Sequence, residues 1–275
     1  MTISDKRFLA ALNSEPVKKD DRLYFISEKE FSGVKEEMQT GINKFKTLLK
    51  LWPGLYNFLQ ALFTPAFSMI GFVSYNKILR VAFGAREPKD KIILNLGSGT
   101  KRINPEIINV DIYPFKNVDV VADIRKLPFK DGSIDMVIVD SVLEHVGRVG
   151  EAIGEITRVV KPRGYVYATV PFVYPFHASP NDFYRWTQEG LKSDFAAFRP
   201  VLLGMRGGPM AALQGVLIHV FSLLLSFRIQ KLYSFLTQFF MVVLAPLKLL
   251  DFIFILFPQS HEIGAHIYLL GRKRE

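Results

Sequence analysis

The chain has 275 residues, a formal net charge of +9 at pH 7, no cysteine and a hydrophobic content of 49%. The lack of cysteine excludes disulfide bonds and thiolate metal sites, and the basic charge favours an anionic partner such as phospholipid headgroups, a phosphorylated substrate or nucleic acid. Residues 1–21 are charged throughout, so we expect no cleaved signal peptide.

The first region, residues 1–86, is predicted to be helical and partly apolar. It is polar and charged to about residue 50, and residues 51–76 then contain no aspartate, glutamate, lysine or arginine. Prolines and glycines interrupt this apolar stretch, which predicts broken helices rather than one continuous rod.

The second region, residues 87–206, alternates short β-branched runs with a helical pattern. Residues 91–96 are predicted to form a buried strand that runs into the glycine turn Gly97-Ser98-Gly99. Further strands are predicted at residues 107–111, 118–121, 134–140 and 164–170. Residues 149–160 have apolar side chains at helical spacing, and Lys161-Pro162-Arg163-Gly164 is typical of the end of a helix. Strands that alternate with helices predict a parallel α/β sheet with helices on both faces.

The rest of the chain combines an apolar insertion, residues 207–260, with a last core strand and basic tail, residues 261–275. One strand is predicted just before the insertion, at residues 201–205, and another after it, at residues 265–271. Residues 207–227 carry no charged side chain and are long enough, at about 20 residues, to span a bilayer.

We expect the insertion to lie along a membrane surface rather than to cross it. Its second apolar run, residues 232–247, is short for a span, and Arg228 and Lys231 lie between the two runs. A transmembrane hairpin would place that basic turn outside the cytoplasm, against the positive-inside tendency. The last strand must also return to the sheet, which forbids an odd number of crossings. Interfacial helices or a shallow hairpin satisfy both conditions; the alternative is a soluble helical cap packed on residues 51–81.

Unusual polar residues follow the predicted parallel strands, at the edge where open α/β sheets bind their ligands. They are Gly97-Ser98-Gly99, Asp111, Asp123, Asp140 with Glu144 and His145, and the segment 174–186. A glycine turn lets the backbone approach a ligand, and an aspartate after the second strand is suited to a ribose diol. Plain alternatives exist: an ordinary tight turn for the glycines, a turn aspartate at Asp111 and a helix N-cap at Asp123.

Several sequence segments resemble the successive motifs of class I S-adenosylmethionine-dependent methyltransferases. They are LNLGSGT (residues 94–100), NVDI (109–112), DVVADIRKLPFKDGSIDMVIVDSVLEHV (119–146) and RVVKPRGYVYATVPF (158–172). Within that class they resemble the broad group that methylates quinones, sugars and other small molecules. PFHASPNDFYRWTQEGL (175–191) is similar to a segment of members encoded with cell-surface glycan biosynthesis.

The resemblance implies a Rossmann-like, seven-stranded methyltransferase sheet with helices on both faces. To this the chain adds N-terminal helices and an apolar helical insertion before the last strand. The implied cofactor is S-adenosylmethionine. By the same resemblance, Gly97, Ser98 and Gly99 would border its methionine part, Asp111 with Ile112 would bind the ribose, Asp123 with Ile124 would hold the adenine, and Asp140 with Ser141 would lie along the methionine side.

Two positions depart from the family pattern. Asn95 stands where an acidic residue is usual, and Lys101 stands where a third glycine is expected. The short connection from Gly97 to Asp111 also implies that part of the first helix is lost, which weakens its dipole as a cofactor anchor. The same shortness argues against a dinucleotide-binding enzyme, whose pyrophosphate needs a glycine-rich helix start.

The candidate catalytic residues are His145 and His177, the two histidines at the predicted rim of the site. A histidine suits the role of a base if the methyl acceptor is a hydroxyl. Alternatively, His145 is held structurally by a neighbouring loop, and the segment around His177 is a lid packed by Phe183 and Trp186. The spacing of these histidines and the nearby acids along the chain shows no recognisable metal-ligand pattern, so no metal is expected.

The most favoured function is methylation of a glycan or lipid-linked intermediate by a protein bound peripherally at the cytoplasmic face of the membrane. Methylation of a polyprenylated quinone or another small molecule is the alternative within enzymes, and a catalytically silent methyltransferase fold that acts as a scaffold is the alternative outside them. Nucleic acid is disfavoured as a partner because the basic residues are dispersed and no aromatic-basic platform is present. The oligomeric state stays open.

Overall fold

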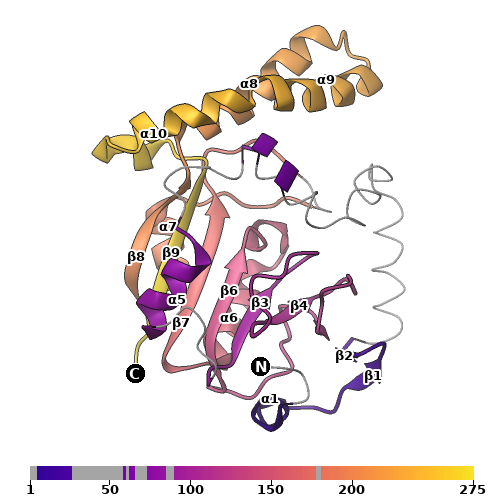
Figure 1. Ribbon diagram of the computed structural model, residues 1–275, viewed down its shortest axis with the longest axis vertical. Coiled ribbons are helices and arrows are strands. Elements are labelled where there is room, and N and C mark those ends of the chain that lie inside the picture. The colour runs from indigo at the N-terminus through magenta and orange to yellow at the C-terminus, as the bar shows by residue number, and fades with distance from the viewer. Residues whose placement is uncertain (1–4, 27–57, 60–61, 66–72, 85–89, 178–180) are drawn as a thin grey trace.

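The computed structural model describes residues 5–26, 58–59, 62–65, 73–84, 90–177 and 181–275 (Figure 1). Most of the apolar stretch predicted to form broken helices, residues 51–76, lies outside these described residues. The N-terminal boundary of the predicted core, residue 87, lies outside them too.

The core is one mixed sheet in the order β1-β2-β5-β4-β3-β6-β7-β9-β8. Its seven central and C-terminal strands are β3 (Ile93–Leu96), β4 (Ile108–Asp111), β5 (Val120–Val121), β6 (Ile134–Asp140), β7 (Val160–Pro171), β8 (Phe198–Gly207) and β9 (His266–Lys273). Strands β5, β4, β3, β6 and β7 are parallel, in the order of a doubly wound fold, and β9 inserts antiparallel between β7 and β8. The prediction of an α/β sheet closed by a strand near the C-terminus is confirmed.

The sheet has nine strands rather than the seven predicted, because an N-terminal hairpin extends it. Strands β1 (Val17–Lys19) and β2 (Arg22–Tyr24) are joined by a turn whose two aspartates have positive φ, and β2 lies parallel to β5 with Leu23 opposite Val120. Each strand has only three residues, too few for an alternating pattern to emerge from the charged sequence around them. Residues 1–86 are therefore not purely helical.

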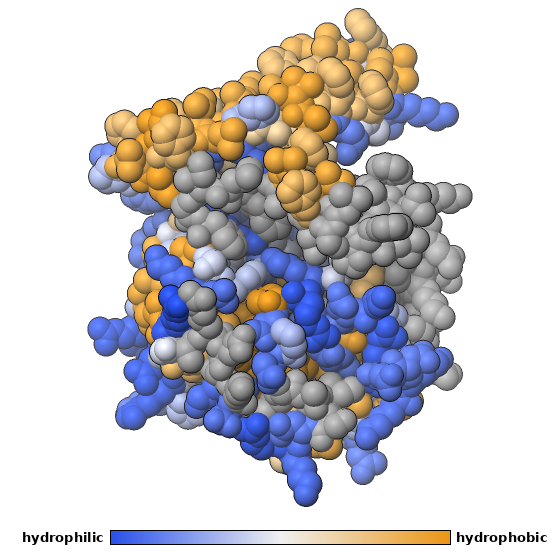
Figure 2. Space-filling view, viewed as in Figure 1, coloured by the Kyte–Doolittle hydropathy of each residue, from blue (hydrophilic) through white to orange (hydrophobic). Residues whose placement is uncertain are grey.

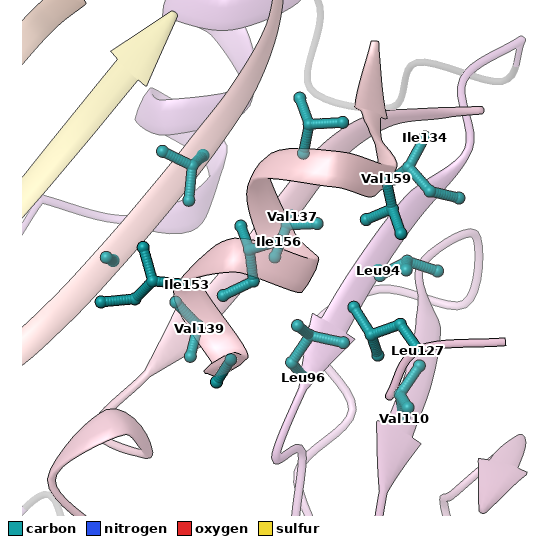
Figure 3. Close-up of a cluster of buried hydrophobic side chains, with 14 of the residues drawn as sticks. Leu94, Leu96, Val110, Leu127, Ile134, Val137, Val139, Ile153, Ile156 and Val159 are labelled. Carbon is teal, nitrogen blue, oxygen red and sulfur yellow. The ribbon is translucent and has the colours of Figure 1, made fainter. Parts of the chain in front are cut away.

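Helices cover both faces of the sheet. On one face, α6 (Val149–Val159) places Ile153, Ile156 and Val159 in the larger apolar cluster with Val137 (Figure 3). On the other, α5 (Tyr75–Phe83) places Ile78 and Leu79 in a second cluster with alternate residues of β3 and β6. The short helices of the core are α1 (Lys6–Ala11), η1 (Leu143–His145) and α7 (Gln188–Asp194).

The helix predicted at residues 149–160 ends slightly earlier than expected from the residues 161–164. Helix α6 ends at Val159 and β7 begins at once with Val160, so these residues belong to the strand rather than to a helix end.

The apolar insertion forms a layer of helices at the edge where β8 ends (Figure 1). It comprises α8 (Pro209–Leu225), α9 (Gln230–Val243), η2 (Ala245–Leu250), α10 (Asp251–Phe254) and η3 (Pro258–Glu262). The Asp251 carboxylate accepts hydrogen bonds from the first backbone N–H groups of α8, at 2.7 Å from Met210 and 3.2 Å from Ala211. Figure 2 shows hydrophobic residues gathered on this layer, above a mostly hydrophilic body.

Among the described residues no single helix is both long and apolar enough to cross a membrane. One pair of helices, residues 230–243 and 245–254, passes the same test of length and composition only when taken together, and it is bent by 40°.

Candidate functional site

The glycine turn after β3 presents open backbone beside a buried, unsatisfied hydroxyl. Gly97 and Gly99 have φ of +62° and +55°, a backbone that side-chain-bearing residues rarely adopt. A Cβ on Gly97 would overlap Val142, whereas a Cβ on Gly99 would meet no described atom within 4 Å. The Ser98 Oγ is buried and has no hydrogen-bond partner in the described part of the chain. A buried orphan donor next to open backbone fits a polar ligand at this turn.

Asp111 links the end of β4 to the glycine turn. Its carboxylate accepts hydrogen bonds from the backbone N–H of Gly99 at 2.7 Å and of Tyr113 at 2.9 Å, and the residue is 7% exposed. A carboxylate has about four acceptor positions, the type of group that can accept both hydroxyl protons of a ribose diol. The following residue, Ile112, is half-buried beside it.

Asp123 begins a turn rather than a helix. Its Oδ1 accepts the backbone N–H of Arg125 at 2.8 Å, and the Arg125 guanidinium bonds both carboxylate oxygens. Burial raises the pKa of Asp123, but the hydrogen bonds from Arg125 outweigh burial and lower it. Residues 123–133 contain no helix, so the N-cap alternative is wrong. Ile124 packs against the larger apolar cluster.

Asp140, at the end of β6, is the centre of a network that the sequence did not predict. Its carboxylate pairs with the buried Arg206 guanidinium, accepts the hydroxyl of Tyr75 and accepts the Thr169 hydroxyl at 2.5 Å. Ser141 follows with φ +55°, a strained backbone for a residue with a side chain. The predicted contact of Asp140 and Ser141 with the cofactor stays a prediction, because internal partners already use much of the Asp140 carboxylate.

The two departures from the family pattern have structural partners. The Asn95 amide donates to the side-chain oxygen of Asn109 at 3.0 Å, and the Lys101 ammonium lies 2.8 Å from the Tyr75 hydroxyl and 3.5 Å from the Asp140 carboxylate. Residues 97–107 contain no helix, so the first helix is missing entirely rather than in part. No helix dipole is therefore available at this turn, and hydrogen bonds hold the loop instead.

His145 and His177 come together beside a buried glutamate, Glu144. The two imidazole rings have centroids 5.1 Å apart. The Glu144 Oε1 lies 4.0 Å from the Nε2 of His145 and 3.7 Å from the Nε2 of His177. Glu144 is fully buried, and neither of its carboxylate oxygens has a hydrogen-bond partner among the described residues. The structure brings together the two histidines that were each predicted to lie at the rim of the site, and their catalytic role stays a prediction. Glu144 is the member of the cluster that sequence reasoning left without a role.

The segment after β7 holds His177 in place. Asp182 accepts the backbone N–H of His177 at 2.8 Å and both terminal nitrogens of Arg185 at 2.6 Å. Burial raises the pKa of Asp182, but these bonds outweigh it and lower the pKa to about 2. Phe183 is 52% exposed rather than packed as a lid, whereas Trp186 is buried and its indole N–H donates to Asp194 at 2.7 Å.

A comparison with known families bears on this edge of the sheet. Residues 99–168 match the family model described as a methyltransferase domain, and this match includes Asp111, Asp123, Asp140 and His145. The chain carries a methyltransferase domain. The cofactor of this domain is S-adenosylmethionine, as the sequence motifs predicted.

Three relatives of the methyltransferase domain illustrate the similarity. The chain is 32% identical to an uncharacterised protein of Methanocaldococcus jannaschii over 94 residues, which are 30% of this chain and 41% of that protein. It is 29% identical over 173 residues to the tRNA (carboxymethyluridine(34)-5-O)-methyltransferase of Arabidopsis thaliana, covering 56% of this chain and 42% of that one. The solved 1,6-didemethyltoxoflavin-N1-methyltransferase of Burkholderia thailandensis is 13% identical, with 94% of each chain covered and a TM-score of 0.48. The chain therefore spans less than half the length of the curated relatives it matches.

Proposed function

We propose that the protein transfers a methyl group from S-adenosylmethionine to a glycan or lipid-linked intermediate while its apolar helices rest on the cytoplasmic face of a membrane. The observation that carries this proposal is the position of the apolar layer directly beside the His177 segment. The methyl acceptor would then reach the site from the lipid surface.

The cofactor would bind across the carboxyl ends of β3, β4 and β5. Ser98 would use its orphan hydroxyl and Gly99 its open backbone, and the Asp111 carboxylate, which already binds the Gly99 N–H, would face the ribose. Asp123 and Ile124 would border the adenine. When bound, S-adenosylmethionine supplies an electrophilic methyl group on sulfur.

The residues of this chain would align the acceptor and manage its proton. The Nε2 atoms of His145 and His177 face Glu144, so a hydroxyl lying between them meets two acceptors. Its proton would leave toward this cluster as its oxygen bonds to the methyl carbon and the carbon–sulfur bond breaks. Alignment and exclusion of water are the main contributions that a protein makes to such a displacement.

Contacts between the apolar layer and the site support a lipid-borne acceptor. Helix α8 packs its first alanines with Val173 and Tyr174, just before His177, and the Tyr174 and His177 rings are 4.8 Å apart. The outer surface of the layer is strongly apolar, with Leu224 68% and Phe227 77% exposed. Such a surface is typical of a contact with lipid or with another protein.

The proposal is tested with labelled cofactor and membranes from a strain that lacks this gene. We expect label from S-[methyl-³H]adenosylmethionine to enter the lipid or lipid-linked glycan fraction. The His145→Ala variant should lower this turnover by about 10²- to 10⁴-fold. Label that appears only in water-soluble products would contradict a lipid-linked acceptor, and label in a quinone would favour ring methylation instead.

The depth of membrane contact is tested with a single introduced cysteine. Because the chain has no cysteine, Gln230→Cys at the start of α9 gives one thiol between the two apolar helices. We expect a membrane-impermeant reagent to label it only from the cytoplasmic side. Labelling from the outer side would establish a transmembrane hairpin and contradict the surface-bound arrangement.

A further inference from the structure

Glu144, His145 and His177 place three metal-ligating atoms around one point. The Glu144 carboxylate oxygen and the two histidine ring nitrogens all lie within 4.8 Å of one another. Ligand atoms around a tetrahedral Zn²⁺ are about 3.4 Å apart when the bonds are about 2.0–2.1 Å long. The two Glu144 contacts, at 4.0 and 3.7 Å, exceed that spacing by about 0.6 and 0.3 Å, and no pair of the three atoms exceeds it by more than about 1.4 Å.

The protein already fixes the orientation of both imidazole rings. The Nδ1 of His145 lies 2.5 Å from the carbonyl oxygen of Asn181, and the Nδ1 of His177 lies 3.2 Å from that of Pro175. The Nδ1 of His177 also lies 3.3 Å from the Asp182 carboxylate and 3.4 Å from a terminal nitrogen of Arg185. A carbonyl only accepts, so the tautomer protonated at Nδ1 is the one that would donate to these carbonyls and leave each Nε2 as a lone pair available to a metal. Metal-bound histidines are oriented in this way, with the second ring nitrogen bonded to a carbonyl or carboxylate.

Glu144 supplies an independent observation. Its side chain is fully buried, and both carboxylate oxygens lack hydrogen-bond partners among the described residues. A buried carboxylate without hydrogen bonds is costly, and such groups normally ligate a cation or pair with a charge. In the described part of the chain, the cationic side-chain nitrogens within 4.0 Å of this carboxylate are the two Nε2 atoms, and imidazole nitrogens can themselves bind a metal ion.

The segments that bear these residues are connected to each other, and one side of the cluster is open. The backbone N–H of Phe183 donates to the carbonyl of Glu144 at 2.7 Å, which ties the segment after β7 to η1. The side chains of His145 and His177 are 16% and 30% exposed. Three protein ligands with an open position are typical of a catalytic rather than a structural metal site.

We propose that Glu144, His145 and His177 bind a divalent transition-metal ion of the Zn²⁺ type, with the open position facing the methyl acceptor. Two imidazoles and one carboxylate suit such an ion better than Mg²⁺ or Ca²⁺, which prefer oxygen ligands. The role toward the acceptor rests on the proposed function: a hydroxyl at the open position would be acidified by the ion and would release its proton to water. The two histidines are then ligands rather than free bases.

The test is a Zn²⁺ titration by calorimetry on untagged, chelator-treated protein. The wild type should bind one Zn²⁺, and Co²⁺ in its place should give the visible absorption of a low-symmetry nitrogen–oxygen site. Glu144→Gln, His145→Asn and His177→Asn should each weaken binding by at least about 100-fold, more than the loss of an outer partner costs. His261→Asn is the matched control: its Nδ1 also lies near a backbone carbonyl, that of Pro258 at 2.6 Å, but it is exposed and outside the cluster.

S-adenosylmethionine affinity and circular dichroism are measured on the same samples. A wild type that binds the cofactor but not Zn²⁺ would overturn the metal site and leave the proposed function standing. Zn²⁺ binding that His261→Asn weakens as much as His177→Asn would also overturn it. Zn²⁺ binding without any affinity for the cofactor would instead contradict the proposed function.

Discussion

Two glycines of one turn have the same backbone but different surroundings. Both Gly97 and Gly99 have positive φ, yet only at Gly97 would an added Cβ overlap a neighbour, Val142. Gly97→Ala should therefore lower the free energy of unfolding by about 2–5 kcal/mol, the sum of backbone strain and overpacking. Gly99→Ala should cost only about 1–2 kcal/mol, for the strain alone. Urea unfolding measures both.

A second substitution separates the two causes. Val142→Ala in the Gly97→Ala background should restore the stability lost to the overlap with Val142. The loss of stability due to backbone strain should remain. Equal losses for the two glycine variants, with no recovery, would show that Val142 does not limit the turn.

Asp111 has both a structural and a predicted binding role, and a pair of substitutions distinguishes them. Asp111→Ala removes the acceptor of the Gly99 and Tyr113 N–H groups and the proposed ribose contact. We expect S-adenosylmethionine affinity to fall by about 10- to 150-fold, since a hydrogen bond to a charged group is worth about 1.5–3 kcal/mol. Asp111→Asn keeps one acceptor oxygen, so its affinity for S-adenosylmethionine should fall less than that of Asp111→Ala. Calorimetry measures the affinity of each variant, and Asp90→Ala, which removes an exposed carboxylate elsewhere, is the control. If all three variants bind S-adenosylmethionine equally well, Asp111 is not part of the site.

At the scale of elements, the segment after β7 depends on one ionised carboxylate. The pKa of Asp182 is lowered from 3.8 to about 2 in the folded protein. A lowered folded-state pKa adds stability that is fully present above about pH 4 and is lost as the pH falls toward 2. The Asp182→Asn variant should thus be less stable than the wild type by about 2–3 kcal/mol at pH 6, and the difference should shrink between pH 4 and 2. The urea midpoints of both proteins are measured across that pH range. A difference between variant and wild type that stays constant with pH would contradict this role of Asp182.

The elements show what the sequence could predict. Strands β3, β4, β6 and β9 were predicted because each is a short, largely apolar run, and α6 because its apolar residues repeat with helical spacing. The hairpin β1–β2 has no such pattern and exists because Leu23 pairs with β5. Sheet order, which decides that pairing, is a property of the assembled fold.

The site was predictable only where it follows strands directly. Asp111 ends β4, and His145 lies in η1, shortly after β6, so the sequence placed both residues at this edge of the sheet before their contacts were known. Asp140 is different, because its partners are distant in the chain: Tyr75 belongs to α5 and Arg206 to β8. Likewise, the contact of His177 with Glu144 depends on a loop held by backbone hydrogen bonds, which spacing along the chain does not encode.

At the scale of the whole molecule, basic and apolar side chains lie together at one end. Phe227, which is 77% exposed, lies just after the end of α8. It is followed by Arg228 and, at the start of α9, by Lys231. Apolar side chains next to basic ones are suited to an anionic lipid surface, where each charge adds about 1 kcal/mol. Strand β1, which carries Val17 with 69% of its surface exposed, lies at the opposite end of the molecule (Figure 1).

These two residues form a matched pair for a liposome test. Phe227→Asp should weaken flotation with phosphatidylglycerol vesicles by about 10- to 150-fold, because burying a phenylalanine is worth about 1.5–3 kcal/mol. Val17→Asp adds the same charge farther from the proposed lipid contact than the Debye length of about 8 Å, so binding should change little. If the wild type binds and both variants lose equally, net charge rather than the α8–α10 layer controls binding. If the wild type does not bind at all, the membrane proposal fails, and the exposed apolar helices then need a protein partner or a cap from this chain.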